Sequence, residues 1–476
     1  MKKKDLRSKE WFDNPNDPGL TALYLERYLN YGLKREDLQS GKPIIGIAQS
    51  GSDLSPCNRH FQELSKTIKD GIRIAGGVPM EFPTHPIQET GKRPTAALDR
   101  NLSYLSLVEV LYGYPIDGVI LTTGCDKTTP AALMAAATVN IPSIVLSGGP
   151  MLDGSYKGKK AGSGTIIWEA RKLHAKGEID YDEFMDMAAA SAPSVGHCNT
   201  MGTASSMNSI AEALGMSLTG GAIIPAPYKE RENISFETGK RIVDMVHEDL
   251  TPSKIMTKEA FENAIYVASA IGASSNCPPH LTAIARHMGI DFGIDNWEKL
   301  GHDIPLLVNC QPAGEHLMEG FFKAGGVPAI MQELLKNNKL NKKVMTVTGK
   351  TVEENLKTKI DVDQKVIRSF KNPLINNAGF IVMKSNFFSS AVMKTSVISS
   401  EFRKRYLSNQ KTPNVFEANA VVFEGPEDYH LRINDETLKV DENSILMIRG
   451  CGPVGYPGSG EVVNMQPPDR LLKKGI

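Results

Sequence analysis

The sequence predicts an α/β protein, with a mostly parallel sheet in an N-terminal domain and a smaller, β-rich, barrel-like domain after it. Short apolar runs at residues 44–48, 118–123 and 143–146 each lead into a loop of small residues, and helical patterns lie between them. Strands that alternate with helices are typical of a parallel sheet. After about residue 343 the sequence changes to short β-like runs separated by turn residues.

The first apolar run is followed by a clear helical pattern. Residues 44–48 end in a Gly- and Ser-containing loop at 49–52. The apolar residues that follow are spaced by 3, 4, 4 and 3, which places them on one face of a helix. They are Phe61, Leu64, Ile68, Ile72 and Ala75.

The second run repeats this arrangement. Residues 118–123 lead into a loop at 124–129, and Pro130 then stands at the first position of an alanine-rich helix at 131–139, where proline is favoured. Because ligands collect at the carboxyl ends of parallel strands, both loops are candidate parts of a binding site.

The remaining patterns divide the chain into three parts. Helices are expected at residues 20–31, 181–191, 205–215, 258–271 and 280–289, and β-like runs at 344–347, 366–370, 379–383, 418–423 and 445–448. We predict an N-terminal arm at residues 1–40, an α/β domain at 41–350 and a β-rich domain at 351–476.

The composition excludes several classes of protein. The chain has 54 Lys+Arg and 54 Asp+Glu, so its formal net charge is zero. A neutral protein has no overall positive potential that would attract nucleic acid or an anionic membrane. Apolar stretches such as 264–273 are shorter than the roughly 18 residues of a membrane span, and no signal-peptide pattern follows the basic first residues. Six cysteines in 476 residues are too few for a disulfide scaffold. We expect a cytoplasmic protein without nucleic-acid or membrane partners.

Three cysteines share one context. Cys57, Cys125 and Cys198 each lie just before an expected helix, where backbone N–H groups and the helix dipole favour a thiolate. Thiolates bind iron and zinc. The spacing alone favours three unrelated buried cysteines, since the thiols are far apart in the sequence. The other three cysteines have weaker contexts and are interpreted as structural: Cys277, Cys310 and Cys451.

Acidic residues near these loops suggest a second site. Asp126 and Lys127 directly follow Cys125, Glu89 lies in a proline-containing loop, and Glu461 follows a glycine-rich phrase. Carboxylates of this kind could hold Mg²⁺, although each one taken singly is typical of a solvated surface charge.

One apparent phosphate motif is excluded. Residues 349–351 read Gly-Lys-Thr, but Val344 stands where a phosphate-binding loop needs its first glycine.

Three longer phrases carry a family resemblance. Residues 124–130, 196–204 and 452–458 resemble the dihydroxy-acid and sugar-acid dehydratase family, and the similarity runs from about Lys42 to the last residue. Residues 225–231 and 461–468 are similar to its pentonate branch, the xylonate and arabinonate dehydratases.

The resemblance implies two cofactors. It implies an iron–sulfur cluster held by Cys57, Cys125 and Cys198 in the N-terminal domain, with [2Fe–2S] favoured over [4Fe–4S]. It also implies a Mg²⁺ held by four residues, and the lysine among them can be carbamylated in this family. They are Glu89, Asp126, Lys127 and Glu461.

The implied activity is that of a hydro-lyase. It dehydrates a small sugar acid of the D-xylonate or L-arabinonate type to a 2-keto-3-deoxy acid, and the enzyme is expected to be a homodimer or homotetramer. The branched-chain dihydroxy-acid dehydratase is an alternative that differs in substrate and would need a more apolar pocket around C3.

The catalytic base is expected outside the chain. In the family, a serine in a Gly-Arg-x-Ser-Gly loop of the C-terminal domain takes the C2 proton, and that loop is expected beyond Ile476. We therefore expect a truncated, incomplete C-terminal domain, with no catalytic residue identified in the chain. An inactive cluster-binding remnant is the corresponding alternative.

Overall fold

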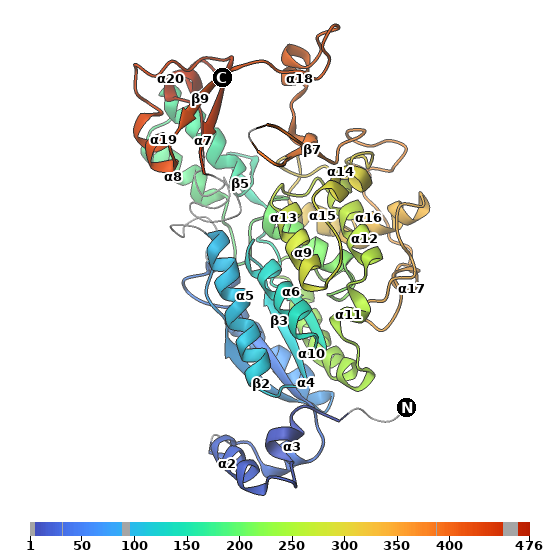
Figure 1. Cartoon of the computed structure of the whole chain (residues 1–476). Helices are drawn as coiled ribbons and strands as arrows, with labels where there is room; N and C mark the ends of the chain where they lie inside the picture. The colour runs from blue at the N-terminus through green and yellow to red at the C-terminus, as the bar shows by residue number, and fades with distance from the viewer. Residues whose placement is uncertain (1–4, 31, 88–95, 387, 451–464) are drawn as a thin grey trace.

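A four-stranded parallel sheet forms the centre of the N-terminal domain. The structure, a computed structural model, describes residues 5–30, 32–87, 96–386, 388–450 and 465–476. The strands are β1 (Ile44–Gln49), β2 (Val78–Pro83), β3 (Gly118–Thr123) and β4 (Ser143–Ser147), in the order β2-β1-β3-β4 (Figure 1). All three strand pairs are parallel, which confirms the predicted sheet.

The helices that join the strands cover both faces of this sheet. Helix α4 (Phe61–Ile74) joins β1 to β2 and packs with α10 (Lys229–Glu248). Helices α5 (Ala96–Gly113) and α6 (Thr128–Val139) lead to β3 and β4 and pack against each other. Right-handed connections that leave β1 and β3 in opposite directions place these two helix pairs on opposite faces. The carboxyl ends of β1 and β3 therefore border the crevice at which such sheets bind ligands.

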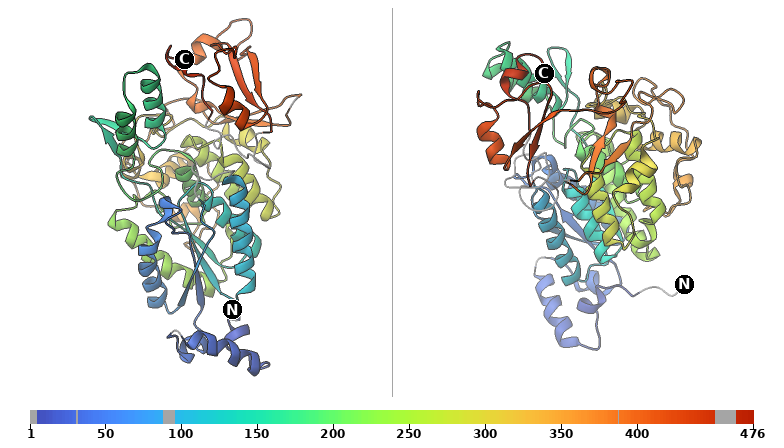
Figure 2. Two further views of the ribbon diagram at one scale, coloured as in Figure 1. Left: turned by 90° about the vertical axis from the view of Figure 1, so that its left-hand side faces the viewer. Right: turned by 45° about the horizontal axis from the view of Figure 1, so that its top comes forward.

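The N-terminal arm lies at the other end of the sheet. It contains α1 (Lys9–Phe12), α2 (Pro18–Leu29) and α3 (Arg35–Gln39), and Figure 2 shows it on the far side of the sheet from the C-terminal elements. The Asp117 carboxylate fixes it there, because it accepts hydrogen bonds from the backbone N–H groups of Ser8 and Ile44, at 3.1 and 2.7 Å. The arm thus leaves the carboxyl ends of the strands uncovered.

The predicted helices of the first 300 residues are present, with one correction. Helix α6 begins at Thr128, so Pro130 is its third residue and not its first. The backbone N–H of Ala131 donates to the carbonyl oxygen of Lys127 at 3.2 Å, and this first helical bond places the start of α6 before Pro130. The other described helices up to residue 355 are α7 (Thr165–Lys176), α8 (Tyr181–Ala190), α9 (Thr203–Ala213), α11 (Pro252–Ile255), α12 (Lys258–Ala270), α13 (Cys277–His287), α14 (Asp295–Gly301), α15 (Met318–Lys323), α16 (Gly326–Lys336) and α17 (Val352–Asn355). Two short strands, β5 (Gly154–Tyr156) and β6 (Lys159–Ala161), lie before α7.

The C-terminal part has less β-structure than the sequence predicted. Its described strands form two separate pairs, antiparallel β7 (Phe380–Met383) with β8 (Ala391–Lys394) and parallel β9 (Asn419–Phe423) with β10 (Ser444–Ile448). Three of the five expected β-runs correspond to β7, β9 and β10. The described residues do not show a barrel. The remaining elements are helices, α18 (Ser400–Tyr406), α19 (Pro426–Arg432) and α20 (Asp469–Leu472), of which α20 lies against α7 (Figure 1).

The runs at residues 344–347 and 366–370 were predicted wrongly as strands. They make only isolated bridges, Met345 with Thr351 and Ile367 with Val308. Both runs contain buried apolar side chains, and burial of a loop against the core produces the same apolar pattern as a strand.

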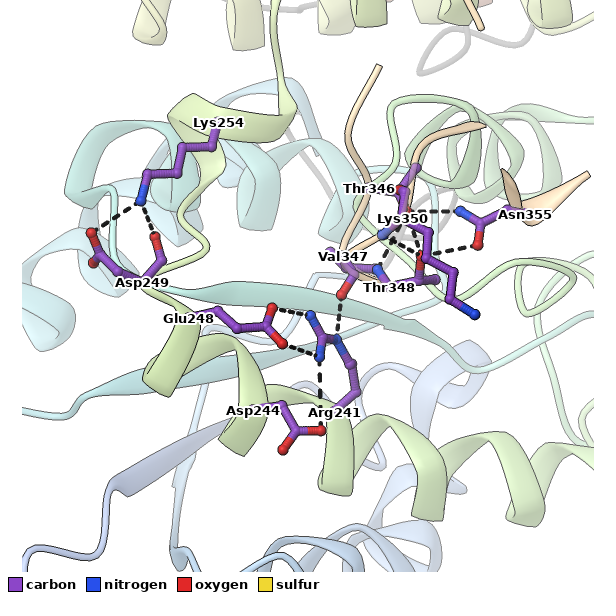
Figure 3. Close-up of polar contacts among 10 residues, drawn as sticks. All are labelled: Arg241, Asp244, Glu248, Asp249, Lys254, Thr346, Val347, Thr348, Lys350 and Asn355. Carbon is purple, nitrogen blue, oxygen red and sulfur yellow. Dashed lines mark hydrogen bonds and ion pairs between the residues drawn. The ribbon is translucent and has the colours of Figure 1, made fainter. Parts of the chain in front are cut away.

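The Gly-Lys-Thr sequence at residues 349–351 lies in a structural turn. Thr346 Oγ1 donates to the carbonyl oxygen of Lys350 at 2.9 Å and so closes the turn (Figure 3). Arg241 of α10 donates from Nε to the carbonyl oxygen of Val347 at 2.6 Å. The turn is thus fastened to α10, in agreement with the exclusion of a phosphate loop.

No helix among the described residues is long and apolar enough to cross a bilayer.

Two glycines allow α4 and α10 to touch. A Cβ atom on Gly71 would lie 2.2 Å from the carbonyl oxygen of Phe236, and one on Gly239 would lie 2.4 Å from that of Ile68. Backbone atoms cannot move aside as a flexible side chain can, so any larger residue must push the two helices apart.

We predict that Gly71→Ala lowers the free energy of unfolding by about 1–3 kcal/mol, the usual range for overpacking. Urea unfolding followed by circular dichroism measures the change. The matched control is Gly113→Ala at the exposed end of α5, where an added Cβ meets nothing within 4 Å. A Gly71→Ala variant as stable as the control would contradict the close helix contact.

Candidate active site

The loops that follow β1 and β3 bring two cysteines together. Cys57 lies in a short 3₁₀ turn, Pro56–Asn58, before α4, and Cys125 lies in the loop between β3 and α6. Their side chains are in hydrogen-bond contact. Cys125 is buried and Cys57 is half-buried. The pair therefore stands at the crevice between β1 and β3.

The Asn58 side chain joins these two loops. Its Oδ1 accepts a hydrogen bond from the Cys125 N–H at 3.0 Å. A Cβ atom on Gly124 would lie 2.3 Å from the same Oδ1, so only glycine leaves room for this amide. Asn58 is completely buried, and its contact fixes the backbone of Cys125 relative to Cys57.

Helix α9 ties the third cysteine loop to the same place. At its start, Ser205 Oγ donates to the carbonyl oxygen of Cys198 at 3.2 Å. One turn later, Asn208 Nδ2 donates to the carbonyl oxygen of Gly124 at 3.1 Å. The backbone of the Cys198 loop is thus linked through α9 to the residue before Cys125, while the Cys198 side chain is exposed.

The described residues do not contain a complete metal-binding group. In residues 5–30, 32–87, 96–386, 388–450 and 465–476, no three or more His, Cys, Asp and Glu side chains are arranged to hold a metal ion. The structure thus pairs two of the three predicted thiols. All three cysteines, Cys57, Cys125 and Cys198, remain predictions as cluster ligands.

The neighbours of Cys125 act against one effect that was expected for these thiols. The helix start was expected to favour a thiolate, but contact with the Cys57 thiol and burial raise the pKa of Cys125 well above its usual range. Asp126 beside it adds a further negative charge in the same direction. Burial and like charge therefore outweigh the helix dipole here.

The two described magnesium candidates lie next to the thiol pair. Asp126 and Lys127 are both buried, and Asp126 Oδ2 lies 3.7 Å from Lys127 Nζ. Asp126 Oδ1 has no hydrogen-bond partner among the described atoms, as expected of an oxygen available to a cation. Glu89 and Glu461, the other two predicted ligands, lie outside the described residues, as does Cys451.

Sequence reasoning missed several polar residues at this site. Arg100 of α5 and His280 of α13 are hydrogen-bonded to each other, and Lys127 influences the pKa of His280. Cys277 interacts electrostatically with Asp126, Lys127 and Lys394 of β8. These residues come from three distant segments, α5, α13 and β8, and share no local motif, so their proximity is apparent only in the folded chain. Cys277 and Cys310 are both buried, consistent with a structural role.

Two buried histidines support the cysteine loops. His60 Nε2 hydrogen-bonds to the carbonyl oxygen of Gly148 at 2.9 Å, and His197 Nδ1 to that of Cys198 at 3.0 Å. Burial lowers the pKa of His197 to about 3 and also lowers the pKa of His60. Both imidazoles are therefore neutral at pH 7 and add no charge to the site.

Two family models match most of the chain. The N-terminal domain model of the dihydroxy-acid/6-phosphogluconate dehydratases matches residues 42–355, and the C-terminal domain model matches residues 365–476. The chain belongs to this dehydratase family. The resemblance inferred from the motifs is confirmed, and so is the expectation of a hydro-lyase.

Named relatives of this dehydratase family span most of the chain. A D-xylonate dehydratase from Caulobacter vibrioides is 61% identical over 471 residues, which are 99% of this chain and 79% of that protein. An L-arabinonate dehydratase from Rhizobium leguminosarum bv. trifolii is 44% identical over 482 residues, 100% of this chain and 81% of the relative. A dihydroxy-acid dehydratase from Halothermothrix orenii is 35% identical over 445 residues, which are 92% of this chain and 78% of that protein.

The match to the C-terminal domain model bears on the expected truncation. It extends over residues 365–476, up to the last residue, and so weighs mildly against the expectation that much of this domain is missing. The serine base expected beyond Ile476 stays a prediction.

We predict that Asn58→Ala destabilises the site. The substitution leaves the buried Cys125 N–H without its acceptor, which costs about 1–3 kcal/mol of unfolding free energy. Urea unfolding measures this loss, and Asn16→Ala on the exposed arm serves as control. Equal stability of the two variants would show that Asn58 does not hold the two loops together.

Proposed function

We propose that the chain dehydrates a five-carbon sugar acid, D-xylonate or L-arabinonate, to a 2-keto-3-deoxy acid. The observation that carries this proposal is the 61% identity to a D-xylonate dehydratase over 99% of the chain. The placement of Cys57, Cys125, Asp126 and Lys127 at the crevice of the parallel sheet supports it, because this is where such folds bind small molecules.

The charges around the site agree with an acidic substrate. Besides the two proposed metal ligands Asp126 and Lys127, Arg100 and Lys394 contribute two cationic side chains to this region. Burial lowers the pKa of Lys394 to about 8, and the described residues offer its ammonium group no ion-pair partner. An anionic substrate would compensate the positive charges of such a site.

We propose an iron–sulfur cluster and Mg²⁺ as the cofactors. The donor chemistry fits, since a contacting pair of thiols suits iron and the unpartnered Asp126 oxygen suits Mg²⁺. Cys57, Cys125 and Cys198 would hold the cluster, with [2Fe–2S] favoured. Asp126, Lys127, Glu89 and Glu461 would hold Mg²⁺. When bound, the two groups supply Lewis acidity for the departing C3 hydroxyl and for the substrate carboxylate and C2 hydroxyl.

The protein's own residues bind the substrate and exclude water. Asn58 and Asn208 hold the loops in fixed positions, and burial of Asp126 and Lys127 keeps bulk solvent away from the charges that orient an acid. The low local dielectric strengthens these electrostatic contacts.

The branched-chain dihydroxy-acid dehydratase is the second candidate. Its support is weaker, because the relative of that name is 35% identical, compared with 61% and 44% for the two pentonate dehydratases. The homodimeric or homotetrameric state, the cytoplasmic location and the division at residues 40 and 350 also remain proposals.

We predict that Cys125→Ser protein, purified without oxygen, loses most of its iron and acid-labile sulfide. The serine oxygen is a poorer iron ligand than a thiolate. Cys310→Ser is the matched control, because Cys310 is also buried but its Sγ lies near the carbonyl oxygen of Leu317. Iron content and sulfide are measured for both, and equal iron in the two variants would rule out the cluster assignment.

We predict faster conversion of D-xylonate or L-arabinonate than of 2,3-dihydroxyisovalerate by the protein with its cluster and Mg²⁺ in place. Formation of the 2-keto acid product is followed for all three substrates, and kcat/KM values are compared. Preference for the branched-chain acid would favour the second candidate instead.

A further inference from the structure

A short backbone ladder joins the loop that follows β4 to the loop that carries Cys198. Pro150 and His197 pair as an isolated parallel bridge. The His197 N–H donates to the carbonyl oxygen of Gly149 at 3.0 Å, and the Met151 N–H donates to the carbonyl oxygen of His197 at 2.9 Å. Because His197 directly precedes Cys198, the backbone of Cys198 takes its position from this ladder.

The loop after β4 also rests on the segment of chain before α10. The Ala226 N–H donates to the carbonyl oxygen of Pro150 at 2.8 Å. Ser147 Oγ donates to the carbonyl oxygen of Ala222 at 2.8 Å and accepts from the Gly149 N–H at 3.2 Å. The loop is therefore bonded both to the third cysteine loop and to this segment, so the position of one depends on the other.

Arg231 of α10 fixes the loop and the segment relative to each other. Its side chain is completely buried. Nη1 donates to the carbonyl oxygens of Ser147 and Gly221, and Nη2 donates to that of Ile224. A guanidinium group is planar and its donors point in fixed directions, so the three carbonyl groups are held in one arrangement.

Helix α9 holds the same segment at a second place. Glu212 at its end is buried and accepts hydrogen bonds from the N–H groups of Gly220 and Ala222, at 2.7 and 2.9 Å. Near the start of this helix, Ser205 bonds to the carbonyl oxygen of Cys198. One helix therefore reaches both the segment and the third cysteine loop, and the guanidinium group completes the frame.

Gly149 lets the guanidinium group lie directly against the loop. Its φ is +83°, and a Cβ atom there would lie 2.0 Å from the carbonyl oxygen of Ile224 and 2.7 Å from Arg231 Nη2. Any larger residue must push the loop away from both groups, in a backbone conformation that itself favours glycine. A single methyl group at this position would thus open the frame.

We propose that Arg231 is a positioning residue for Cys198 and acts through the loop after β4. The proposal rests on the proposed function, which makes Cys198 the third ligand of the iron–sulfur cluster. Arg231 would set the place of this ligand's backbone relative to Cys57 and Cys125, whose loops Asn58 joins. Its effect would appear in how firmly the cluster is held.

The test uses the full chain purified without oxygen, with its cluster in place. Release of iron to excess EDTA is timed, and the EPR spectrum of the dithionite-reduced cluster is recorded. Gly149→Ala should release iron about tenfold faster than the wild type and shift the g values, because overpacking displaces one ligand. Gly158→Ala is the matched control: its φ is +80°, but an added Cβ meets nothing within 4 Å, so both readouts should stay unchanged.

Changes at Arg231 itself test the same frame. Arg231→Met should speed iron release and shift the g values, and Arg231→Lys, which keeps the charge and a donor group, should recover part of the loss. Arg241→Met is the matched control, because Arg241 also lies on α10 and donates to a backbone carbonyl oxygen, that of Val347, at 2.6 Å. It should leave both readouts unchanged. A loss of overall stability alone would not change the g values of a cluster that is still bound.

Ser147→Ala replaces Gly149→Ala if the latter does not fold. It removes only the hydroxyl bonds to Ala222 and Gly149, and it should also speed iron release. Wild-type iron release and g values in the folded variant would overturn the proposal. Wild-type protein without iron, or Cys198→Ser protein that keeps its iron, would contradict the proposed cofactor and this proposal with it, so the two failures are distinguishable.

Discussion

The parallel pairing of β1 with β3 is the constraint on which the rest of the site depends. Ile45 to Ala48 lie in register with Gly118 to Leu121, so the two strands end at the same edge of the sheet. Because the connections from these strands leave in opposite directions, no helix covers the space above their ends. Two loops of small and polar residues can therefore meet there, and one buried amide, Asn58, is sufficient to fix their relative positions.

Much of this framework could be predicted from the sequence, but only where local pattern and burial agree. The strands at 44–48, 118–123 and 143–146 are buried throughout and mostly apolar, as is typical of strands covered on both faces. Strand β2 was missed because Pro79 and Pro83 interrupt its pattern, which is tolerated only at a sheet edge. The predictions of strands near residues 345 and 367 were wrong for the opposite reason, because the buried loops there are as apolar as strands.

The site residues also fall into a group that the sequence predicted and a group that it did not. Cys57 and Cys125 could be placed because each follows a predicted strand, and the rule for parallel sheets brings such positions together. The sequence could not place three further residues at the site, namely Arg100, His280 and Lys394. Each lies on a helix or strand without a motif, and only its neighbours in the fold show that it belongs to the site. The pKa values also depend on the fold more than on the sequence, because contact with Cys57 and burial raise the pKa of Cys125, and burial lowers that of His197.

Helix α10 connects three places that are far apart in the sequence. Near its start, the buried Arg231 donates to the carbonyl oxygens of Gly221 and Ser147, the latter at the end of β4. Its middle touches α4 through Gly239, and beyond that Arg241 holds the turn at Val347. A helix of 20 residues spans about 30 Å, so one rigid element joins the site loops to the sheet and to the entry of the C-terminal part. The loop after β4 therefore belongs to the same cooperative unfolding unit as the sheet, and it cannot open locally without breaking the carbonyl contacts of a fully buried arginine.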